Sequence, residues 1–416
     1  MSRGKVFDLG RQGDGLIKEN GRNVFIAGAL PDESVRYRLI SDNRAELEEI
    51  VSASPDRADP VCPFFGQCGG CALQHLSNDL YQRFKLRYFK ELFPTGWNVA
   101  FDDPVFIPFK SRRRATFALL WNGALRKFGF NAKRSDRITE IDSCAVLIES
   151  LEKLIVPLRR FLCDKARAYP KRKGLGDVSV LMTRTGADVL LTLPFEPDFD
   201  WRRSAAQFAA ENGLARLSWR TSERAEPEPL VVLHTPELTV GDFTLKPPAG
   251  VFLQPSVEGR EVLTQAVVEY VGKAKKVMDL FCGAGTFSLP LLQRRRIIKG
   301  ADNAPFALQA LREASAGRIE TQERDLFKTP LYPDELDGFD GVIFDPPRAG
   351  AKAQCEQIAA SNVEKVIAVS CNPVSFVRDA EILINAGFAL ERVRPVDQFA
   401  FTPHLECVAK FVRAGA

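Results

Sequence analysis

From residue 249 to residue 416, short apolar segments alternate regularly with helical ones. The apolar segments are rich in β-branched residues and comprise Lys276–Phe281, Ile297–Ala301, Gly341–Phe344 and Val366–Val369. Strands that alternate with helices in this way build a parallel sheet with helices on both faces. The pattern therefore predicts an α/β fold with a doubly wound, mostly parallel sheet over residues 249–416.

The first of these strands leads into a glycine-rich turn, MDLFCGAGTFSLPL. Gly283 and Gly285 let backbone N–H groups approach a ligand at the start of the next helix. The second strand leads to Asp302, about twenty residues on, where a carboxylate can accept both ribose hydroxyls. A dinucleotide-binding fold shows the same pair, but its fingerprint requires Gly or Ala where Ser288 lies. The segment instead resembles motif I of S-adenosylmethionine-dependent methyltransferases, which implies a Rossmann-like class I methyltransferase domain.

Two further strand ends carry polar groups. Asp345-Pro-Pro-Arg348 follows the third strand and forms a rigid turn above the predicted cofactor site, with a purely structural turn as the alternative. The fourth strand leads to Cys371, followed at once by Asn372-Pro373. Ligands bind outside the carboxyl ends of strands in open α/β sheets, so the position favours a functional thiol. The alternative is a small buried hydrophobe, which most free cysteines are.

A thiol beside a methyl donor has a specific use, because C5 of uracil is a poor nucleophile. A thiolate that adds to C6 places negative charge on C5, which can then attack a sulfonium methyl group. A base must afterwards remove the C5 proton so that the thiol can leave. Cys371 is the predicted thiol and Glu406, in FTPHLECVAKFV, the predicted base, since burial among apolar neighbours would raise its pKa. His404 is the alternative base.

The segments SCNPVSFVRD, DPPRAG, MDLFCGAGTFSLPL and HLE resemble the RNA uracil-5-methyltransferases. The resemblance implies that Cys371 is the nucleophile and Glu406 the proton acceptor. The family's F-x-Q-x-N segment is present here with Ser256 in place of the asparagine. Thr286 and Asp302 replace residues that are often Asn and Glu in relatives. The contacts to S-adenosylmethionine that the resemblance implies are Gln254, Phe281, Thr286, Asp302, Asp325 and Asp345.

Three of the nine cysteines lie within ten residues of one another, in CPFFGQCGGC, and a fourth follows much later. Cys62, Cys68, Cys71 and Cys144 predict a metal centre, because the glycines between them permit tight turns. Zinc sites usually pair two C-x-x-C knuckles, whereas this spacing is closer to iron–sulfur ligation. The family resemblance also implies a 4Fe-4S cluster, because its rRNA-directed branch carries one in this loop. The other cysteines besides Cys371 are expected to have no role in ligation or catalysis.

Residues 1–57 contain several short strand-like runs separated by turn signals, which is typical of a small β-barrel. The stretch from LGRQGDGL to FIAGALPDESV resembles a TRAM domain, an OB-like RNA-binding module. Residues 58–248 are predicted to form a mixed α+β central domain that contains the cysteine loop. Its expected elements are a helix at Ser77–Leu92, strands at Arg114–Trp121 and Val178–Leu193, and a loop at Glu223–Glu228.

The segment Phe109–Arg137 holds nine Lys or Arg residues against one acid, a net charge of +8 in a chain whose total is +4. Concentrated positive charge favours a phosphate-rich partner, with a solvated strand face as the alternative. The aromatic residues interleaved with these charges are typical of a surface that stacks bases, although some are expected to be core: Phe117, Trp121, Phe128 and Phe130. A target base must leave its stack to reach the thiol, so single-stranded or loop RNA is the expected substrate.

The order of barrel, cysteine loop and catalytic domain resembles the enzymes that modify 23S rRNA, with the tRNA T-loop as the second candidate substrate. A non-catalytic RNA-binding assembly factor is the alternative from another class, but such a protein needs neither Cys371 nor Glu406. No run approaches the roughly 18 apolar residues of a membrane span, and the N-terminus has no apolar signal segment. We therefore expect a cytoplasmic protein without a membrane association, and no feature indicates an obligate protein partner.

Overall fold

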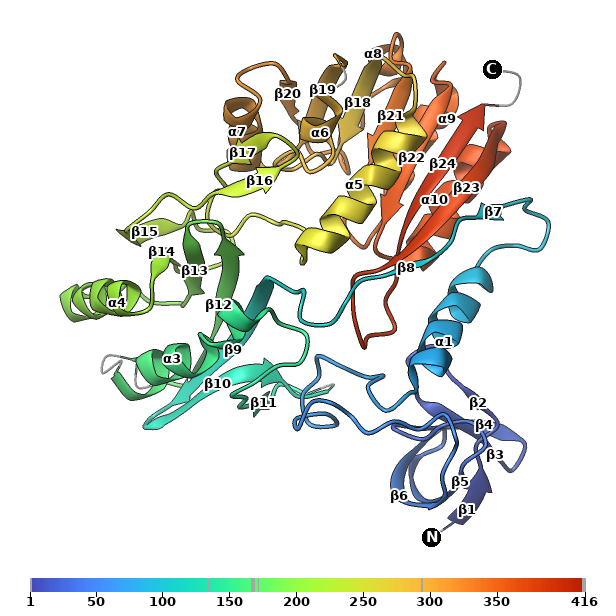
Figure 1. Cartoon of the computed structure of the whole chain (residues 1–416), viewed down its shortest axis with the longest axis vertical. Coiled ribbons are helices and arrows are strands. Elements are labelled where there is room, and N and C mark those ends of the chain that lie inside the picture. Colours follow the sequence, from blue (N-terminus) through green and yellow to red (C-terminus); the bar gives the residue numbers. More distant parts are fainter. Residues whose placement is uncertain (1, 134, 166–168, 171, 293–294, 414–416) are drawn as a thin grey trace.

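The computed structural model describes residues 2–133, 135–165, 169–170, 172–292 and 295–413. Figure 1 shows a small N-terminal sheet at one end of the molecule, a larger central sheet beside it, and the C-terminal sheet with its helices at the other end. Helix α1 (Asn78–Lys90) lies between the N-terminal and the C-terminal sheets.

The N-terminal sheet confirms that the first fifty residues form short, regularly spaced strands. Six strands pair in the order β1-β5-β6-β4-β3-β2, and alternate side chains such as Val24 and Ile26 point into one core. Glu33 is buried beside this core and accepts hydrogen bonds from Arg57 Nε (2.6 Å) and Nη2 (2.8 Å). The strands are β1 (Ser2–Lys5), β2 (Asp8–Leu9), β3 (Gly15–Glu19), β4 (Arg22–Ile26), β5 (Ser34–Ser41) and β6 (Arg44–Ser52).

Helix α1 begins where the sequence predicts, because the Ser77 hydroxyl accepts a hydrogen bond from Leu80 N (3.2 Å) and caps the first turn. The helix also fastens the N-terminal sheet to the rest of the chain. Tyr88 donates its hydroxyl proton to the carbonyl of Leu9, and Arg87 pairs with Asp8 (2.7 Å).

The central sheet has seven strands in the order β11-β10-β9-β12-β13-β14-β15. The predicted strand Val178–Leu193 is in fact two antiparallel strands, because Thr183-Arg-Thr-Gly186 forms a hairpin turn in which Gly186 has φ +127°. The strands are β9 (Arg114–Asn122), β10 (Leu125–Asn131), β11 (Ile138–Thr139), β12 (Gly174–Thr183), β13 (Gly186–Thr192), β14 (Leu214–Arg220) and β15 (Glu228–Val232). The helices are α2 (Glu149–Glu152), α3 (Ile155–Arg159), the π-helical turn η1 (Arg160–Lys165) and α4 (Phe199–Glu211).

The C-terminal sheet confirms the predicted α/β fold. Its parallel strands β20-β19-β18-β21-β22 are followed by β24, which runs antiparallel to β22, and then by β23, which runs antiparallel to β24. These strands are β18 (Lys276–Leu280), β19 (Ile297–Asp302), β20 (Glu320–Glu323), β21 (Gly341–Phe344), β22 (Lys365–Ser370), β23 (Phe388–Asp397) and β24 (Glu406–Arg413). A short hairpin of β16 (Leu238–Val240) and β17 (Phe243–Leu245) precedes them.

Helices cover both faces of this sheet. Apolar residues of α5, α6 and α7 pack with one set of strand side chains, and those of α8, α9, α10 and the end of α1 pack with the alternate set. The helices are α5 (Val257–Val271), α6 (Ser288–Leu292), α7 (Pro305–Ala314), α8 (Pro333–Leu336), α9 (Lys352–Ala360) and α10 (Pro373–Asn385).

The edge of the C-terminal sheet is completed by residues that precede the central sheet in the chain. Strands β7 (Ala100–Phe101) and β8 (Val105–Phe106) both pair in parallel with β23. Between them Asp102 accepts hydrogen bonds from Arg392 (2.9 Å) and Arg394 (2.7 Å) of that strand. The chain therefore crosses from the C-terminal sheet to the central sheet immediately before the basic segment.

Candidate active site

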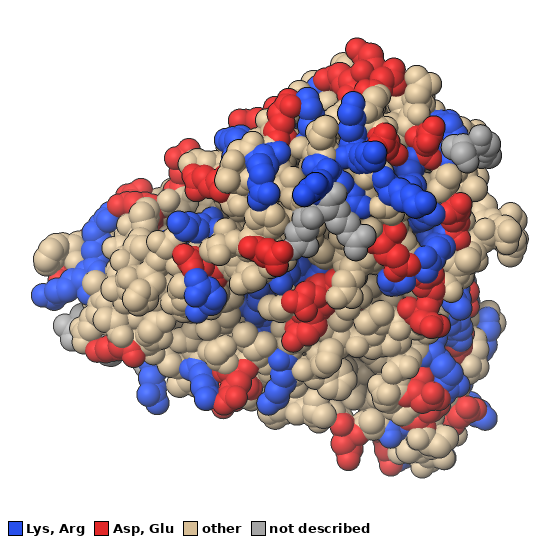
Figure 2. All heavy atoms as spheres, turned by 45° about the horizontal axis from the view of Figure 1, so that its top comes forward, with Lys and Arg blue, Asp and Glu red and all other residues tan. Residues whose placement is uncertain are grey.

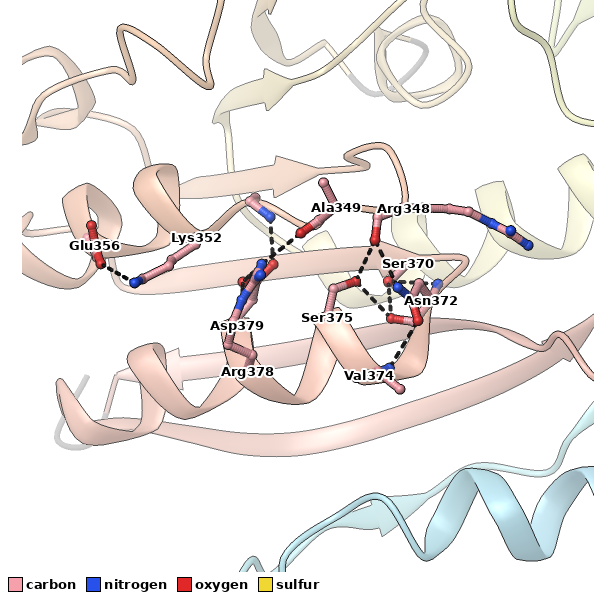
Figure 3. A network of polar contacts seen from close by, with 11 residues as sticks. Arg348, Ala349, Lys352, Glu356, Ser370, Asn372, Val374, Ser375, Arg378 and Asp379 are labelled. Carbon is pink, nitrogen blue, oxygen red and sulfur yellow. Dashed lines mark hydrogen bonds and ion pairs between the residues drawn. The ribbon is translucent and has the colours of Figure 1, made fainter. Parts of the chain in front are cut away.

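The ends of β21 and β22 are joined by hydrogen bonds between their two turns (Figure 3). Asn372 caps helix α10 through its side chain, which accepts from Val374 N (3.3 Å), and its Nδ2 donates to the carbonyl of Arg348 (2.8 Å). Ser375 Oγ donates to the same carbonyl (3.0 Å). The Asn-Pro pair after Cys371 thus starts a helix and also fixes the Asp345–Arg348 turn against it.

The second half of this turn is held by the next turn of α10, which Figure 3 also shows. Asp379 accepts a hydrogen bond from Ala351 N (2.6 Å), and Arg378 Nη2 donates to Ala349 O (2.9 Å). Gly350 lies between them with φ +80°, and a Cβ atom there would collide with both side chains. The tight approach therefore requires glycine at this position.

Strand register places Glu406 opposite Cys371. In the antiparallel pair of β22 and β24, Ser370 is the partner of Cys407, so the next residue on each side brings the thiol and the carboxyl together. Burial raises the pKa of the Cys371 thiol to about 11, the Glu406 and Asp345 carboxylates add to the rise, and Arg348 opposes it. The structure thus brings together the two predicted catalytic residues and one predicted cofactor contact.

A chain of side-chain amides connects the two carboxyl groups. Gln398 Nε2 donates to Glu406 Oε2 and to Gln254 Oε1 (2.7 Å), and Gln254 Nε2 donates to Asp345 Oδ2 (3.5 Å). All four side chains are buried or nearly so. Sequence reasoning missed Gln398, whose only signal was its position directly after an apolar strand, in VDQFAF.

Both carboxyl groups hold protons more tightly than an exposed acid does. Burial raises the pKa of Glu406 to about 8, the nearby Asp345 charge adds to the rise, and the hydrogen bond from Gln398 lowers it. Burial likewise raises the pKa of Asp345 to about 7. Once such a carboxyl group has lost its own proton, it binds another more tightly than an exposed carboxylate does. The predicted alternative, His404, is half-buried, and burial lowers its pKa.

The glycine turn after β18 has the geometry of a nucleotide-binding turn. Asp302 accepts hydrogen bonds from Gly283 N and from Ala304 N, both at 2.9 Å, which places its carboxylate beside the turn. Gly285 has φ +88° and lies so close to Leu311 that a Cβ atom would not fit. Glycine at this position therefore lets the backbone of the turn pack directly against Leu311.

Three other predicted cofactor contacts lie around this turn. Phe281 has the left-handed φ of +59° and its ring packs on Phe327 at 5.4 Å between centroids. Asp325 accepts a hydrogen bond from Phe327 N (3.1 Å), which ties the loop after β20 to the same ring pair. Thr286 follows Gly285 and is half-buried.

The serine that replaces the family asparagine has a clear structural role. Ser256 Oγ accepts a hydrogen bond from Gly259 N (3.0 Å) and caps helix α5. Because Gln254 lies two residues earlier, the cap fixes the helix start next to the amide chain.

The four predicted metal-binding cysteines line one cavity of about 300 Å³. Burial raises the pKa of Cys71 to about 12, and the charges of Cys144, Cys68 and Cys62 add to the rise, so the four thiols are close together. Within the described residues, no group of three or more His, Cys, Asp or Glu side chains could hold a metal ion as arranged. The thiols thus surround a space and do not converge on one point.

Several side chains of the basic segment, Phe109–Arg137, are buried or paired and do not lie on a free surface. Phe117, Trp121 and Phe128 are fully buried in the central core, as was expected of some of the four aromatic residues, so these three form no base-stacking surface. Arg113 is buried as well, and Lys133 pairs with Asp14 of the N-terminal sheet (3.2 Å). Strand alternation buries every second side chain, so an aromatic run there packs inward.

Arg134 of this segment lies outside the described residues. Figure 2 shows one face of the molecule, on which Lys and Arg side chains are interspersed with Asp and Glu. In the part of the chain that the structure covers, no helix has the length and apolar character needed to cross a membrane.

Comparison with known proteins agrees with this geometry. A model of the tRNA (uracil-5-)-methyltransferase family matches residues 333–413. A protein of Agrobacterium fabrum named as an RNA methyltransferase is 36% identical over 97% of this chain and 97% of its own length. The 23S rRNA (uracil(1939)-C(5))-methyltransferase of Aeromonas hydrophila is 30% identical over 96% of this chain and 93% of its own.

One solved structure is similar over the whole chain. The Pyrococcus abyssi tRNA (uracil-54, C5)-methyltransferase, in complex with S-adenosyl-L-homocysteine, matches with a TM-score of 0.75 over 99% of this chain and 100% of its own. Sequence identity is 23%, so this likeness concerns the fold.

The raised pKa of Glu406 predicts a specific pH dependence of stability. The folded protein keeps the Glu406 proton up to a pH of about 8, whereas the unfolded chain releases it near the ordinary value of 4.5. The contribution is therefore fully present below pH 4.5 and is lost as the pH rises through 8. We expect Glu406→Gln to remove up to about 1.4 kcal/mol per pH unit from the slope of unfolding free energy against pH.

The measurement is urea unfolding of the parent and the variant at intervals from pH 5 to pH 8. Glu356→Gln is the control, because that side chain is half exposed. Identical slopes for the parent and Glu406→Gln would contradict the raised pKa.

Proposed function

Because the chain belongs to the S-adenosylmethionine-dependent RNA uracil-5-methyltransferases, we propose that it methylates C5 of a specific uridine through a covalent adduct between Cys371 and C6 of the base. The observation that carries the proposal is the pairing of β22 with β24, which sets a thiol opposite a buried carboxyl at the ligand-binding edge of the sheet. No binding protein without chemistry needs that pair, so an RNA-binding assembly factor explains the site less well.

The residues around the glycine turn fit S-adenosylmethionine. Asp302 places a carboxylate beside Gly283, where it can accept the ribose hydroxyls, and Phe281 and Phe327 offer apolar ring surface nearby. Thr286, Asp325, Asp345 and Gln254 complete the proposed contacts. When bound, S-adenosylmethionine supplies the methyl group as an electrophile.

In the first step, Cys371 loses its proton and its sulfur adds to C6 of the flipped uracil. The S–C6 bond forms as the electrons of the C5=C6 bond move onto C5 and the C4 carbonyl oxygen. Arg348 lowers the pKa of this thiol, against the rise due to burial, so its guanidinium favours the thiolate. C5 would then take the methyl group from bound S-adenosylmethionine and become tetrahedral, and the electrons of the broken S–CH3 bond would stay on the sulfur of S-adenosylhomocysteine.

In the second step, Glu406 removes the C5 proton. The electrons of the C–H bond rebuild the C5=C6 bond, and the Cys371 thiolate leaves. Gln398 and the register of β24 hold the carboxyl in place, and its raised pKa makes the ionised carboxylate a stronger proton acceptor than an exposed one. The enzyme returns to its starting state when Glu406 releases the C5 proton to water and the Cys371 thiolate takes back the proton that it lost in the first step.

We favour 23S rRNA as the substrate. The Aeromonas hydrophila relative that acts there aligns over nearly the whole of both chains. The tRNA T-loop is the second candidate, supported by the family model and by the similar fold of the Pyrococcus abyssi enzyme. The N-terminal sheet, residues 1–57, is proposed to act as a TRAM-like RNA-binding module in either case.

Cys62, Cys68, Cys71 and Cys144 are proposed to hold a 4Fe-4S cluster. The donor set fits because four thiols surround one cavity of about 300 Å³, and Gly70 N donates to Cys68 Sγ (3.4 Å). Arg112 and Arg114 line the same cavity and can offset the negative charge of the thiolates. A polynuclear cluster suits donors that surround a space better than a single zinc ion does.

The covalent mechanism predicts opposite effects of two substitutions. Cys371→Ala should lower methylation by about 10⁴-fold or more while RNA binding remains measurable. Glu406→Gln should slow turnover by about 10²–10⁴-fold and leave the methylated RNA attached to the enzyme, because elimination needs the base. Transfer of labelled methyl groups and denaturing gels measure both effects, with Cys163→Ala as the control. Undiminished turnover by Cys371→Ala would refute the mechanism.

The choice of substrate is tested in cells that lack the gene. We expect mass-spectrometric mapping to show that one 5-methyluridine is missing from 23S rRNA and that tRNA is unchanged. The parent gene should restore the modification, and the Cys371→Ala gene should not. Loss of the T-loop modification with intact rRNA would make tRNA the substrate.

The cluster predicts a brown protein after anaerobic purification, with about four iron and four sulfide per chain. Cys144→Ser should lose the visible absorption, whereas Cys163→Ser, which changes a cysteine away from the cavity, should keep it. Stoichiometric zinc without iron would overturn the assignment.

A further inference from the structure

The connection between β23 and β24, residues 398–405, carries Gln398 at its start and leads directly into Glu406. Its position therefore decides where the proposed base lies. Asp397, the last residue of β23, accepts hydrogen bonds from Lys85 Nζ, from the Tyr81 hydroxyl and from Phe399 N (3.2 Å). Both Tyr81 and Lys85 belong to helix α1, more than 300 positions earlier in the chain.

This polar group is deeply buried, although neither step of the proposed chemistry uses it. The side chains of Lys85 and Asp397 are 0% and 3% exposed. Lys85 Nζ also donates to the carbonyl of Phe399 (3.3 Å) and to the Tyr81 hydroxyl (3.2 Å). A buried ion pair is often no more stable than apolar residues of the same volume, so stability alone is a weak reason for it. Its hydrogen bonds have directions, however, and these fix the backbone on both sides of Gln398.

A second contact holds the middle of the connection. Phe401 has φ +59°, and its N–H donates to the Tyr81 hydroxyl (3.1 Å). Its carbonyl accepts from Ala72 N (2.8 Å) and Leu73 N (3.1 Å), the two residues that follow Cys71. The Phe401 ring stacks on Phe109 at 4.2 Å between centroids. The cysteine loop and helix α1 therefore meet on one residue of the connection.

We propose that Tyr81, Lys85 and Asp397 are positioning residues for the general base, which act through Gln398 and the 398–405 connection. The inference rests on the proposed function, since it concerns the removal of the C5 proton by Glu406. Proton transfer requires the base within hydrogen-bond reach of the proton, and a misplacement of about 1 Å can cost 10²-fold in rate. A connection of eight residues without helix or strand needs such external contacts to hold Gln398 and Glu406 in register.

The proposal also assigns the cysteine loop a task in catalysis that needs no electron transfer. Ala72 and Leu73 donate to Phe401, so the loop that would hold the cluster also holds the connection that places Glu406. Addition of the thiol to C6 does not depend on this contact, because Cys371 lies between the end of β22 and the start of α10. A weakened contact should therefore slow elimination more than addition.

The test compares two identical changes on the same helix. Tyr81→Phe keeps the ring and removes the hydroxyl that joins Asp397 to Phe401. Tyr88→Phe is the matched control, because its hydroxyl donates to Leu9 of the N-terminal sheet. We expect Tyr81→Phe to lower turnover about tenfold and to raise the fraction of enzyme trapped on RNA several-fold on denaturing gels, while Tyr88→Phe leaves that trapped fraction at the value of the parent. If the substitution only destabilised the fold, the amount of active enzyme would fall, but the fraction of the active enzyme that is trapped on RNA would not rise.

A second variant keeps the proposal testable if Tyr81→Phe does not fold. Lys85→Met/Asp397→Leu replaces both charges together by apolar groups of similar volume, so neither charge is left buried alone. It should trap RNA as Tyr81→Phe does, and adding Cys371→Ala to either variant should abolish the trapped species. Equal trapping in the parent and in both variants would overturn the positioning role. If the parent itself methylated no uridine, the proposed function would fail first, and the inference with it.

Discussion

The antiparallel pairing of β22 with β24 is the constraint on which the rest of the site depends. A shift of that pairing by one residue would turn every side chain of β24 to the opposite face of the sheet. Glu406 would then leave the thiol, and the apolar residues that follow it would leave the two cores that they now fill. The hydrophobic effect therefore selects the register, and the register brings the Cys371 thiol and the Glu406 carboxyl together without any direct bond between them.

The low polarity that results from this packing raises the pKa values of the Glu406 and Asp345 carboxyl groups and of the Cys371 thiol. Two carboxyl groups close together in a buried site repel each other when both are charged, so at least one of Asp345 and Glu406 tends to keep its proton. The side-chain amides of Gln398 and Gln254 connect these two groups. The same burial disfavours the Cys371 thiolate. A thiol that stays protonated is oxidised more slowly than a thiolate, because the thiolate is the reactive form.

The sequence predicted the strands of the C-terminal sheet well, because β18, β19, β21 and β22 are apolar runs with clear turn signals at their ends. Cys371, Asp345 and Glu406 could be placed together because each lies at the end of a strand. Gln398 could not, since its role follows from how a connection folds back, which has no local pattern. The sequence could not show which aromatic residues of the basic segment belong to the core, because alternation along β9 and β10 decides which side is buried and composition alone does not show it.

The N-terminal sheet is fastened at three points. Asp14 pairs with Lys133 beyond β10, Asp8 pairs with Arg87 of α1, and the carbonyl of Leu9 accepts the Tyr88 hydroxyl. These three contacts restrict the movement of the N-terminal sheet relative to the rest of the protein. Its distance from the thiol is set by the protein, and a polynucleotide that touches both must span that distance. If the N-terminal sheet binds RNA as proposed, a folded substrate would therefore be selected by the length and angle between its two contacts with the protein, and not by the identity of each base.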